Sequence, residues 1–286
     1  MKHLVSIAAV ATALTLAAGA SQAGAVYLTG HDPDFHAQGQ VSGQNQLNVA
    51  LNFVTGGAYN DAAPTKKFLW VESRDPILGG HRRGFDGLAT IGVGATDVDW
   101  VDASQLSAVI FTNYSAIAVA SSFGGMLSTA EINGLISRSA DIASFINGGG
   151  GLAAFAECYQ TAGCDTAGNI TVGTALFGFL PVNVTSVGTA APYIVTAYGA
   201  SLGLTNADVD DCCTHNSFGT NGGLNIVDTD HNGIATTLAG NVSVNGGGFT
   251  GAPEPDAWAL MVLGFGGLGA ALRSRRTTAR MGRLAS

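Results

Sequence analysis

The chain has 286 residues, 41 of them glycine, and only 11% of its residues are charged, where roughly 25% is usual. Its formal net charge is −8, and 47% of its residues are hydrophobic. These values exclude a coiled coil, a highly charged disordered chain and a nucleic-acid binder, which phosphates would repel, but they allow one large domain or two small ones.

The N-terminal end has the pattern of a secretory signal peptide. Lys2 and His3 precede an uncharged run of about 15 residues, which is short for a membrane span. Ser21 and Ala23 then form the small-x-small arrangement that signal peptidase needs, so we expect cleavage after Ala23. Ala25 offers a second cleavage position, and a retained membrane anchor is the alternative.

The exported body is acidic. Residues 24–252 contain six Lys and Arg against eighteen Asp and Glu, a formal charge of −12 (6 minus 18). This charge disfavours binding to anionic lipid and is compatible with divalent cations or with solubility alone.

Two strand-helix-strand units are predicted in the first half of the body. The first has a strand at residues 26–28, a helix with apolar residues Leu47, Ala50, Leu51 and Val54 that Gly56 and Gly57 end, and a strand at residues 68–71. In the second, residues 116–120 and 152–156 form apolar strands. Between them, Ser128 and Glu131 make a capping box for a helix that ends at Gly148–Gly151.

The fold class that follows is α/β, with a three-layer, mostly parallel sheet of the flavodoxin-like or Rossmann-like kind. The stretch after Gly163 is rich in Thr, Val, Gly and Asn and is predicted to be β-rich, with strands around residues 182–187, 193–197, 224–227 and 234–238. We expect this part to complete or flank the same sheet, with a separate β domain as the alternative.

The loop from His31 to His36 leaves the carboxyl end of the first strand, where ligands bind in open α/β sheets. His31, Asp34 and His36 are therefore candidate ligands for Zn or a similar ion. Glu157 and Cys158 are predicted at the same edge, and His215 with Asn216 can join them. The alternative is that these residues only form turns and helix caps.

The segment Asp228, Asp230, Asn232 and Gly233 matches the first positions of a calcium loop. The closing acid is absent, since the twelfth position is Ala239. Asn232 and Gly233 lie between two apolar runs, so we favour a β-hairpin turn over a Ca site.

The four cysteines are Cys158, Cys164, Cys212 and Cys213, an even number in an exported chain. Structural disulfides are expected, and the pairing stays open because adjacent cysteines bridge each other only with strain. A free, nucleophilic Cys158 is the alternative.

The first half of the body resembles the class I glutamine amidotransferase-like group, which is also α/β with a parallel sheet. The resemblance is carried by Gly30, His31 and Asp32 after the first strand and by an apolar strand that runs into Glu157 and Cys158. It implies that Cys158 lies where enzymatic members carry a nucleophile. Glu157, Cys158 and His215 are thus the candidate catalytic residues. Tyr159 and Gln160 follow where those members have a glycine, which disfavours amidotransferase activity.

The C-terminal end has the pattern of a short membrane span. Residues 257–272 carry no charge and, as a helix, would rise roughly 24 Å against a hydrocarbon core of about 30 Å. Five arginines follow within residues 273–286, which places that end in the cytoplasm by the positive-inside rule. The predicted organisation is a signal peptide (1–23), an α/β body (24–250), a linker (251–256), a transmembrane helix (257–272) and a basic cytoplasmic tail (273–286).

The same tail closely resembles the PEP-CTERM sorting signal in its variant with Trp and Ala after Pro-Glu-Pro. The residues that carry this resemblance, over roughly the last 30 positions, are Pro253, Glu254, Pro255, Trp258, Ala259, Gly264, Phe265, Gly266, Arg273, Arg275 and Arg276. The resemblance implies recognition by exosortase, a membrane transpeptidase thought to cut near the Pro-Glu-Pro. An ordinary tail anchor with a proline-rich stem is the alternative.

Taken together, these patterns predict an exported envelope or matrix protein that exosortase processes, with a non-catalytic body that acts by binding or structure. The expected partners are signal peptidase, exosortase, the inner membrane before processing and an envelope polysaccharide. The competing hypotheses are an amidotransferase-like extracellular hydrolase and a binding module that depends on Zn or Ca.

Overall fold

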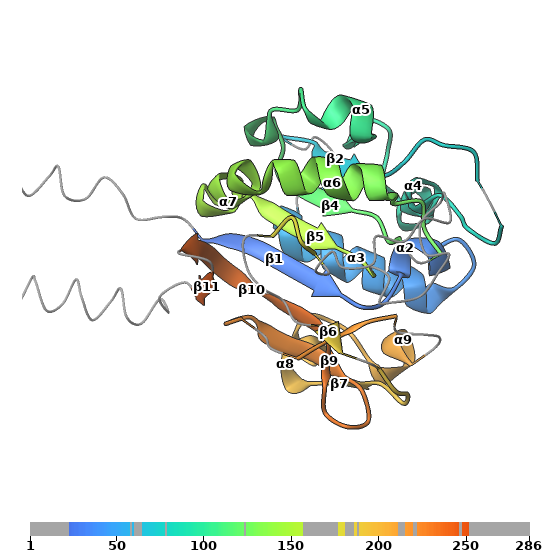
Figure 1. Ribbon diagram of the computed structural model, residues 1–286. Coiled ribbons are helices and arrows are strands. Elements are labelled where there is room, and N and C mark those ends of the chain that lie inside the picture. The colour runs from blue at the N-terminus through green and yellow to red at the C-terminus, as the bar shows by residue number, and fades with distance from the viewer. Residues whose placement is uncertain are drawn as a thin grey trace, which may run out of the picture. The chain divides into compact units, whose positions relative to one another are not determined.

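The computed structural model describes residues 23–57, 59, 65–77, 79–122, 124–156, 177–180, 186–187, 189–210, 215–219, 222–245 and 248–251 (Figure 1). The chain divides into two units, Met1–Gly251 and Ala252–Ser286, and every described residue lies in the first. The predicted signal peptide (1–22 of it), the four cysteines and the sorting motif lie outside the described residues.

The described strands form one mixed sheet in the order β3-β2-β4-β5-β1-β10-β8-β6, with β9 and β11 paired to β10 and β7 paired to β9. The strands are β1 (Gly24–Thr29), β2 (Phe68–Val71), β3 (Val98–Val101), β4 (Ala116–Val119), β5 (Gly151–Ala154), β6 (Ser186–Val187), β7 (Ile194–Val195), β8 (Ser217–Phe218), β9 (Asn225–Thr229), β10 (Ala235–Asn245) and β11 (Gly248–Gly251). Strands β3, β2, β4, β5 and β1 run parallel to one another. Every other pairing is antiparallel.

The prediction of a mostly parallel sheet is therefore wrong. Strand β10 pairs antiparallel with β1 from Gly24↔Val242 to Thr29↔Thr237 and joins the C-terminal strands to the parallel half. The short β9–β10 connection likewise makes β9 and β10 antiparallel to each other, because neighbouring parallel strands need a crossover of a dozen or more residues. The expectation that the part after Gly163 completes the same sheet is confirmed, and the alternative of a separate β domain is excluded.

The fold class also included a C-terminal transmembrane helix, and this part needs correction too. Within the described residues, no helix is long and apolar enough to cross a membrane. Residues 257–272 lie outside the described residues, so the span forms no part of the fold observed.

The predicted second strand-helix-strand unit is confirmed, since β4 and β5 are parallel neighbours with Ala116 opposite Gly151. Ser128 and Glu131 form the capping box that begins α6 (Thr129–Ser137). The predicted single helix is divided at Arg138, and α7 (Ser139–Asn147) follows. The Arg138 side chain donates to the backbone oxygens of Leu106 and Val109, so the break between the two helices is hydrogen-bonded to the segment of residues 106–109.

The elements of the first predicted unit are also present, but its two strands are not neighbours. Helix α3 (Val41–Thr55) buries the predicted apolar residues and ends at Gly56 in the left-handed conformation, with φ of 64°. Figure 1 shows α3 on one side of the parallel strands and α6 with α7 on the other. The remaining helices are short: α2 (Pro33–His36), α4 (Gly84–Leu88), η2 (Ala89–Ile91), α5 (Ala103–Leu106), η3 (Phe111–Asn113), α8 (Ala197–Ser201) and α9 (Asn206–Val209).

Candidate functional site

The parallel strands end at one edge of the sheet, and a group of buried and half-buried polar side chains gathers there. Strand β9 also ends at this edge and β10 begins there, because β10 runs antiparallel to both β1 and β9. We name this group the carboxyl-edge cluster. Its members are His31, Asp32, Asp34, His36, Glu72, Ser121, His215 and Asp228.

Asp32 contacts two imidazoles within this cluster. Its Oδ1 lies 3.3 Å from Nε2 of His36 and 3.1 Å from Nε2 of His215. Burial raises the pKa of Asp32, but the hydrogen bonds and charges of His215 and His36 outweigh that effect, so its pKa is lowered overall. The hydrogen bond to Asp32 in turn raises the pKa of His36. This group therefore favours an ionised Asp32 beside a protonated His36.

His31 has a different partner. Its Nε2 lies 3.1 Å from Oδ1 of Asp228, which also accepts a hydrogen bond from Oγ1 of Thr236. The ring of Tyr193 packs edge-on against the imidazole, with ring centroids 5.4 Å apart. His31 and Asp228 are both buried, so this pair links the end of β1 to β9 inside the protein.

Asp34 is fully buried and accepts a hydrogen bond from the backbone N of Ser121 at 2.9 Å. Two glycines make room for it. A Cβ at Gly84 would overlap Oδ2 of Asp34, and one at Gly125 would lie 3.1 Å from the same oxygen. Burial raises the pKa of Asp34 to about 6, with a further contribution from the negative charge of Asp32.

Glu72 directly follows β2 and is also fully buried. Its carboxylate accepts hydrogen bonds from Nε1 of Trp70 at 2.9 Å, from the backbone N of Gly84 at 2.6 Å and from the backbone N of Phe85 at 3.0 Å. Burial nevertheless raises its pKa to about 7, and the charge of Asp34 adds to this rise. Two neighbouring acids therefore titrate close to neutral pH, which is the range useful for proton transfer or for binding a cationic or hydrogen-bond-donating group.

Some polar atoms at this edge have no hydrogen-bond partner among the described residues. They include Oδ1 of Asp34, Oδ2 of Asp228 and both amide atoms of Asn216, and all three side chains are fully buried. Buried polar atoms are normally satisfied by protein or by ordered water. The concentration of such atoms at the carboxyl edge makes this edge the candidate functional site of the body.

The three predicted metal ligands are not brought together. His31 pairs with Asp228, His36 pairs with Asp32, and Asp34 accepts from Ser121. Within the part of the chain that the structure describes, no group of three or more His, Cys, Asp or Glu side chains is arranged to hold a metal ion. The predicted Zn site at His31, Asp34 and His36 is therefore not supported.

The predicted calcium segment forms the hairpin turn instead. Thr229 pairs with Ala235 across the turn, and Oδ1 of Asp230 accepts from the backbone N atoms of Asn232 and Ile234 at 2.8 and 2.9 Å. Gly233 has φ of 79°, which glycine adopts without strain. The preference for a hairpin is thus confirmed.

Of the three candidate catalytic residues, the structure describes only His215. The backbone N of His215 donates to O of Gly30 at 2.7 Å, and the backbone N of Ala156 donates to O of His31 at 2.9 Å. His215 and the chain position immediately before Glu157 therefore both adjoin the end of β1, as predicted. Glu157 and Cys158 lie outside the described residues, as do Cys164, Cys212 and Cys213.

Sequence reasoning missed Glu72 and Ser121 as members of the site. Both had a detectable signal, because each comes directly after or close to an apolar run that was predicted as a parallel strand. A polar residue in that position falls at the carboxyl edge of the sheet.

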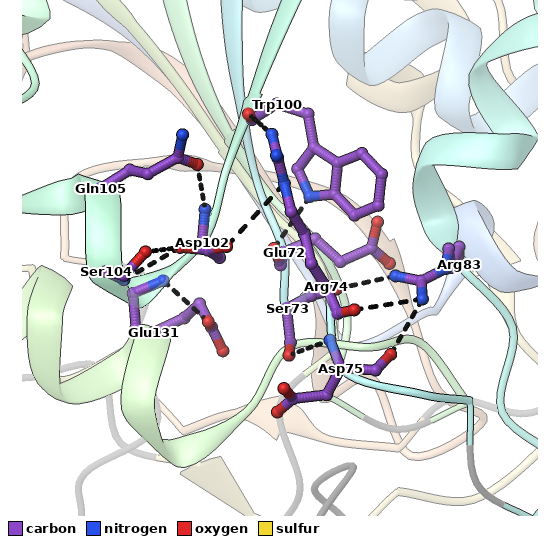
Figure 2. Close-up of polar contacts among 11 residues, drawn as sticks. Glu72, Ser73, Arg74, Asp75, Arg83, Trp100, Asp102, Ser104, Gln105 and Glu131 are labelled. Carbon is purple, nitrogen blue, oxygen red and sulfur yellow. Dashed lines mark hydrogen bonds and ion pairs between the residues drawn. The ribbon is translucent and has the colours of Figure 1, made fainter.

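A second polar group lies beside Glu72, where β2 and β3 end (Figure 2). Nε1 of Trp100 donates to O of Glu72 at 2.8 Å, and the ring of Phe85 stacks on the Trp100 ring with centroids 4.8 Å apart. The guanidinium carbons of Arg74 and Arg83 lie 4.7 and 5.3 Å from the centroid of the same ring. This group covers Glu72 on the side of β3.

A cavity of about 450 Å³ lies at the opposite edge of the sheet. Ala23, Ala25, Lys66 and Gly148–Gly150 are among the residues that line it. The carboxyl-edge cluster contributes none of the lining residues, so the titratable groups and this cavity belong to different ends of the body.

No protein-family model, curated protein or solved structure matches this chain. The resemblances to the PEP-CTERM tail and to the amidotransferase-like group therefore stay predictions, and function is argued below from the residues alone.

Proposed function

We propose that this chain is an exported envelope or matrix protein that exosortase processes at its C-terminal Pro-Glu-Pro signal, and that its α/β body acts by binding. Signal peptidase removes the leader, and processing near residues 253–255 separates the body from the apolar segment and the arginines. The body then presents the carboxyl edge of its sheet outside the cytoplasm.

The observation that supports this proposal most is the position of the two ends of the body. Gly24 and Gly251 are both partners of Val242, one on each side of β10. They are therefore about two strand spacings, or roughly 10 Å, apart at the amino edge of β1. Both predicted processing segments join the body at this edge, and the carboxyl-edge cluster lies at the other end of the strands. Removal of either segment therefore leaves the described strand pairings of the body intact.

The start of β1 also favours one of the two cleavage positions for signal peptidase. Gly24 and Ala25 pair with Val242 and Asn241. A Cβ at Gly24 would overlap O of Gly150, so this residue is closely packed within the body. Cleavage after Ala25 would remove two paired residues, whereas cleavage after Ala23 leaves the strand complete.

The test is to express the full chain in a host that has exosortase and in the same host with exosortase deleted. We expect the first host to yield a product outside the inner membrane that begins at Gly24 and lacks the arginine-rich end, as measured by mass spectrometry. Glu254→Ala should retain the tail, whereas Asp256→Ala should be processed normally. A product that stays in the cytosol, or is never shortened, would overturn the proposal.

An extracellular hydrolase is the second candidate, because His215 and the position before Glu157 both adjoin the end of β1. Counting the thiols of the exported protein separates the two candidates. A free Cys158 that iodoacetamide alkylates, with protection of that thiol by a carbonyl-containing inhibitor, would favour the hydrolase. Four oxidised cysteines would exclude cysteine catalysis, since a disulfide sulfur cannot attack a carbonyl carbon.

A further inference from the structure

Asparagine followed by glycine occurs at Asn133–Gly134, Asn147–Gly148 and Asn232–Gly233 within the described residues. This dipeptide is chemically labile, because the backbone N of the glycine can attack the side-chain carbonyl carbon of the asparagine. Glycine has no Cβ to hinder the attack. The reaction requires that the amide side chain and the backbone N can reorient toward each other. The three sites therefore differ in reactivity according to how firmly their surroundings hold these two groups.

The first two pairs are held by helices. Asn133 and Gly134 lie inside α6, where each backbone N–H is bonded to a carbonyl oxygen one turn earlier. At the end of α7, Nδ2 of Asn147 donates to O of Val244 at 2.9 Å, and its Oδ1 accepts from the backbone N of Val244 at 2.6 Å. The backbone N of Gly148 donates to carbonyl oxygens of the same helix at 3.0 and 3.1 Å. Attack at either site therefore requires part of a helix to open.

The third pair lies at the tip of the β9–β10 hairpin, where His231, Asn232 and Gly233 are all exposed. Nδ2 of Asn232 lies 3.5 Å from Oδ2 of Asp230, which is beyond the usual length of a hydrogen bond. The backbone N of Gly233 donates to O of Asp230 at 3.0 Å across a single turn. An exposed turn opens at little cost in free energy, so the two reacting groups of this pair are the least firmly held of the three.

We propose that Asn232 is a site of spontaneous deamidation, at which the asparagine is converted to a mixture of aspartate and isoaspartate. The backbone N of Gly233 loses its proton and bonds to Cγ of Asn232, and the side-chain nitrogen leaves as ammonia. The product is a cyclic succinimide. One water molecule then opens the ring at either of its carbonyl carbons, which gives aspartate or isoaspartate. Water is the co-reactant, and no oxidant or reductant is needed.

Either product changes the hairpin tip. Each converted molecule gains one carboxylate on a body whose formal charge is already −12 (6 minus 18). In isoaspartate the main chain also runs through the side-chain carbons and is one atom longer. Oδ1 of Asp230 accepts from the backbone N atoms of Asn232 and Ile234, so the longer main chain lies between two donors that this carboxylate holds. The modification requires neither the binding function nor the sorting proposed above.

The test is to incubate the purified full chain in detergent at mildly alkaline pH and to follow the three asparagines by peptide mapping with mass spectrometry. In the folded chain we expect Asn232 to convert about tenfold faster, or more, than Asn133 and Asn147. We expect both aspartate and isoaspartate at position 232, since a succinimide opens in two ways. In the same chain unfolded in urea, the three sites should convert at similar rates, because glycine follows each of them.

Gly233→Ala is the matched variant, because it keeps the asparagine and adds only the methyl group that hinders the attack. A Cβ at Gly233 meets nothing within 4 Å among the described residues, but its φ of 79° strains alanine. Asn232→Gln is therefore the second variant, since glutamine would have to form a larger and slower ring. Both variants should slow conversion at position 232 and leave Asn147 unchanged. Equal rates at the three sites of the folded chain, aspartate without isoaspartate, a rate difference that persists in urea, or an unchanged rate in both variants would overturn the proposal.

Discussion

Asp34 and Glu72 meet at Gly84, which their carboxyl groups approach from beyond the ends of two different strands. Oε1 of Glu72 accepts a hydrogen bond from the backbone N of Gly84 at 2.6 Å, and a Cβ at that residue would overlap Oδ2 of Asp34. Asp34 follows β1 and Glu72 follows β2, and β4 and β5 lie between these two strands in the sheet. Helix α4, which begins at Gly84, therefore links the two acids across the edge.

Gly84→Ala is expected to destabilise the body. Its Cβ would overlap Oδ2 of Asp34 and lie 2.8 Å from Cζ2 of Trp70, and neither of these buried groups has room to move. We expect the free energy of unfolding to fall by about 1–3 kcal/mol, as measured by urea denaturation. Gly80→Ala is the control, since a Cβ there meets nothing within 4 Å. Equal stability of the two variants would show that Gly84 is not crowded.

The stability of the body is expected to fall as pH rises through the acidic range. The pKa of Glu72 is raised from 4.5 to about 7 and that of Asp34 from 3.8 to about 6, so between the unfolded and folded values the folded state binds more protons. Ionising these groups at higher pH therefore costs stability. Glu72→Gln should remove much of this slope between about pH 5 and 7. It should also lower stability overall, because an amide NH₂ replaces one acceptor.

Urea denaturation at a series of pH values measures this effect, with Asp86→Asn as the control for loss of one exposed carboxyl group. His36 acts in the same direction, since its raised pKa contributes stability that is lost as pH rises through the folded value. A slope that Glu72→Gln leaves unchanged would mean that Glu72 is not the group that titrates.

The parallel half of the fold was predictable because its signals are local. A continuous apolar run such as Ala116–Val119 marks a strand buried on both faces, and the Ser128 capping box marks where a helix begins. The antiparallel half was not predictable in its order. Only the hairpin turn at Asp230 gave a local signal, and nothing in β10 itself shows that it pairs with β1, which lies more than 200 residues earlier.

The candidate site was predictable in place but not in detail. Topology alone put the loop after β1 at the carboxyl edge, and His215 indeed lies there. The partners of each side chain depend on long-range contacts, so no sequence pattern indicates that His36 shares Asp32 with His215 whereas His31 pairs with Asp228. The three candidate metal ligands are kept apart for this reason, since each of them has a different partner although all lie in one loop.

Asp32→Asn is expected to lower the pKa of His36 toward its ordinary value of 6.5. The hydrogen bond to Asp32 is the largest cause of the raised pKa, and an uncharged amide does not stabilise an imidazolium as a carboxylate does. The change also removes the stability that ionised Asp32 contributes above its unfolded pKa, so we expect a loss of about 1–3 kcal/mol at neutral pH. Proton NMR titration of the His36 ring measures the shift. Asp228→Asn, which removes the partner of His31, should leave the His36 titration in place.

Arg83→Lys is expected to loosen the loop of residues 73–77 and 79–83 while keeping its charge. The guanidinium donates to O of Ser73 at 3.2 Å, O of Arg74 at 3.3 Å and O of Asp75 at 2.9 Å, and a lysine ammonium cannot span all three. We expect faster amide hydrogen exchange in the loop and a loss of about 0.5–1.5 kcal/mol in the free energy of unfolding. Arg82→Lys is the control, because its guanidinium stacks on Phe35 at the surface and fastens no backbone oxygen within the described residues. If the two variants exchange alike, the loop is held by Trp100 and Phe85 and not by Arg83. If only Arg83→Lys exchanges faster, the hydrogen bonds of the Arg83 guanidinium to the three backbone oxygens hold the loop in place.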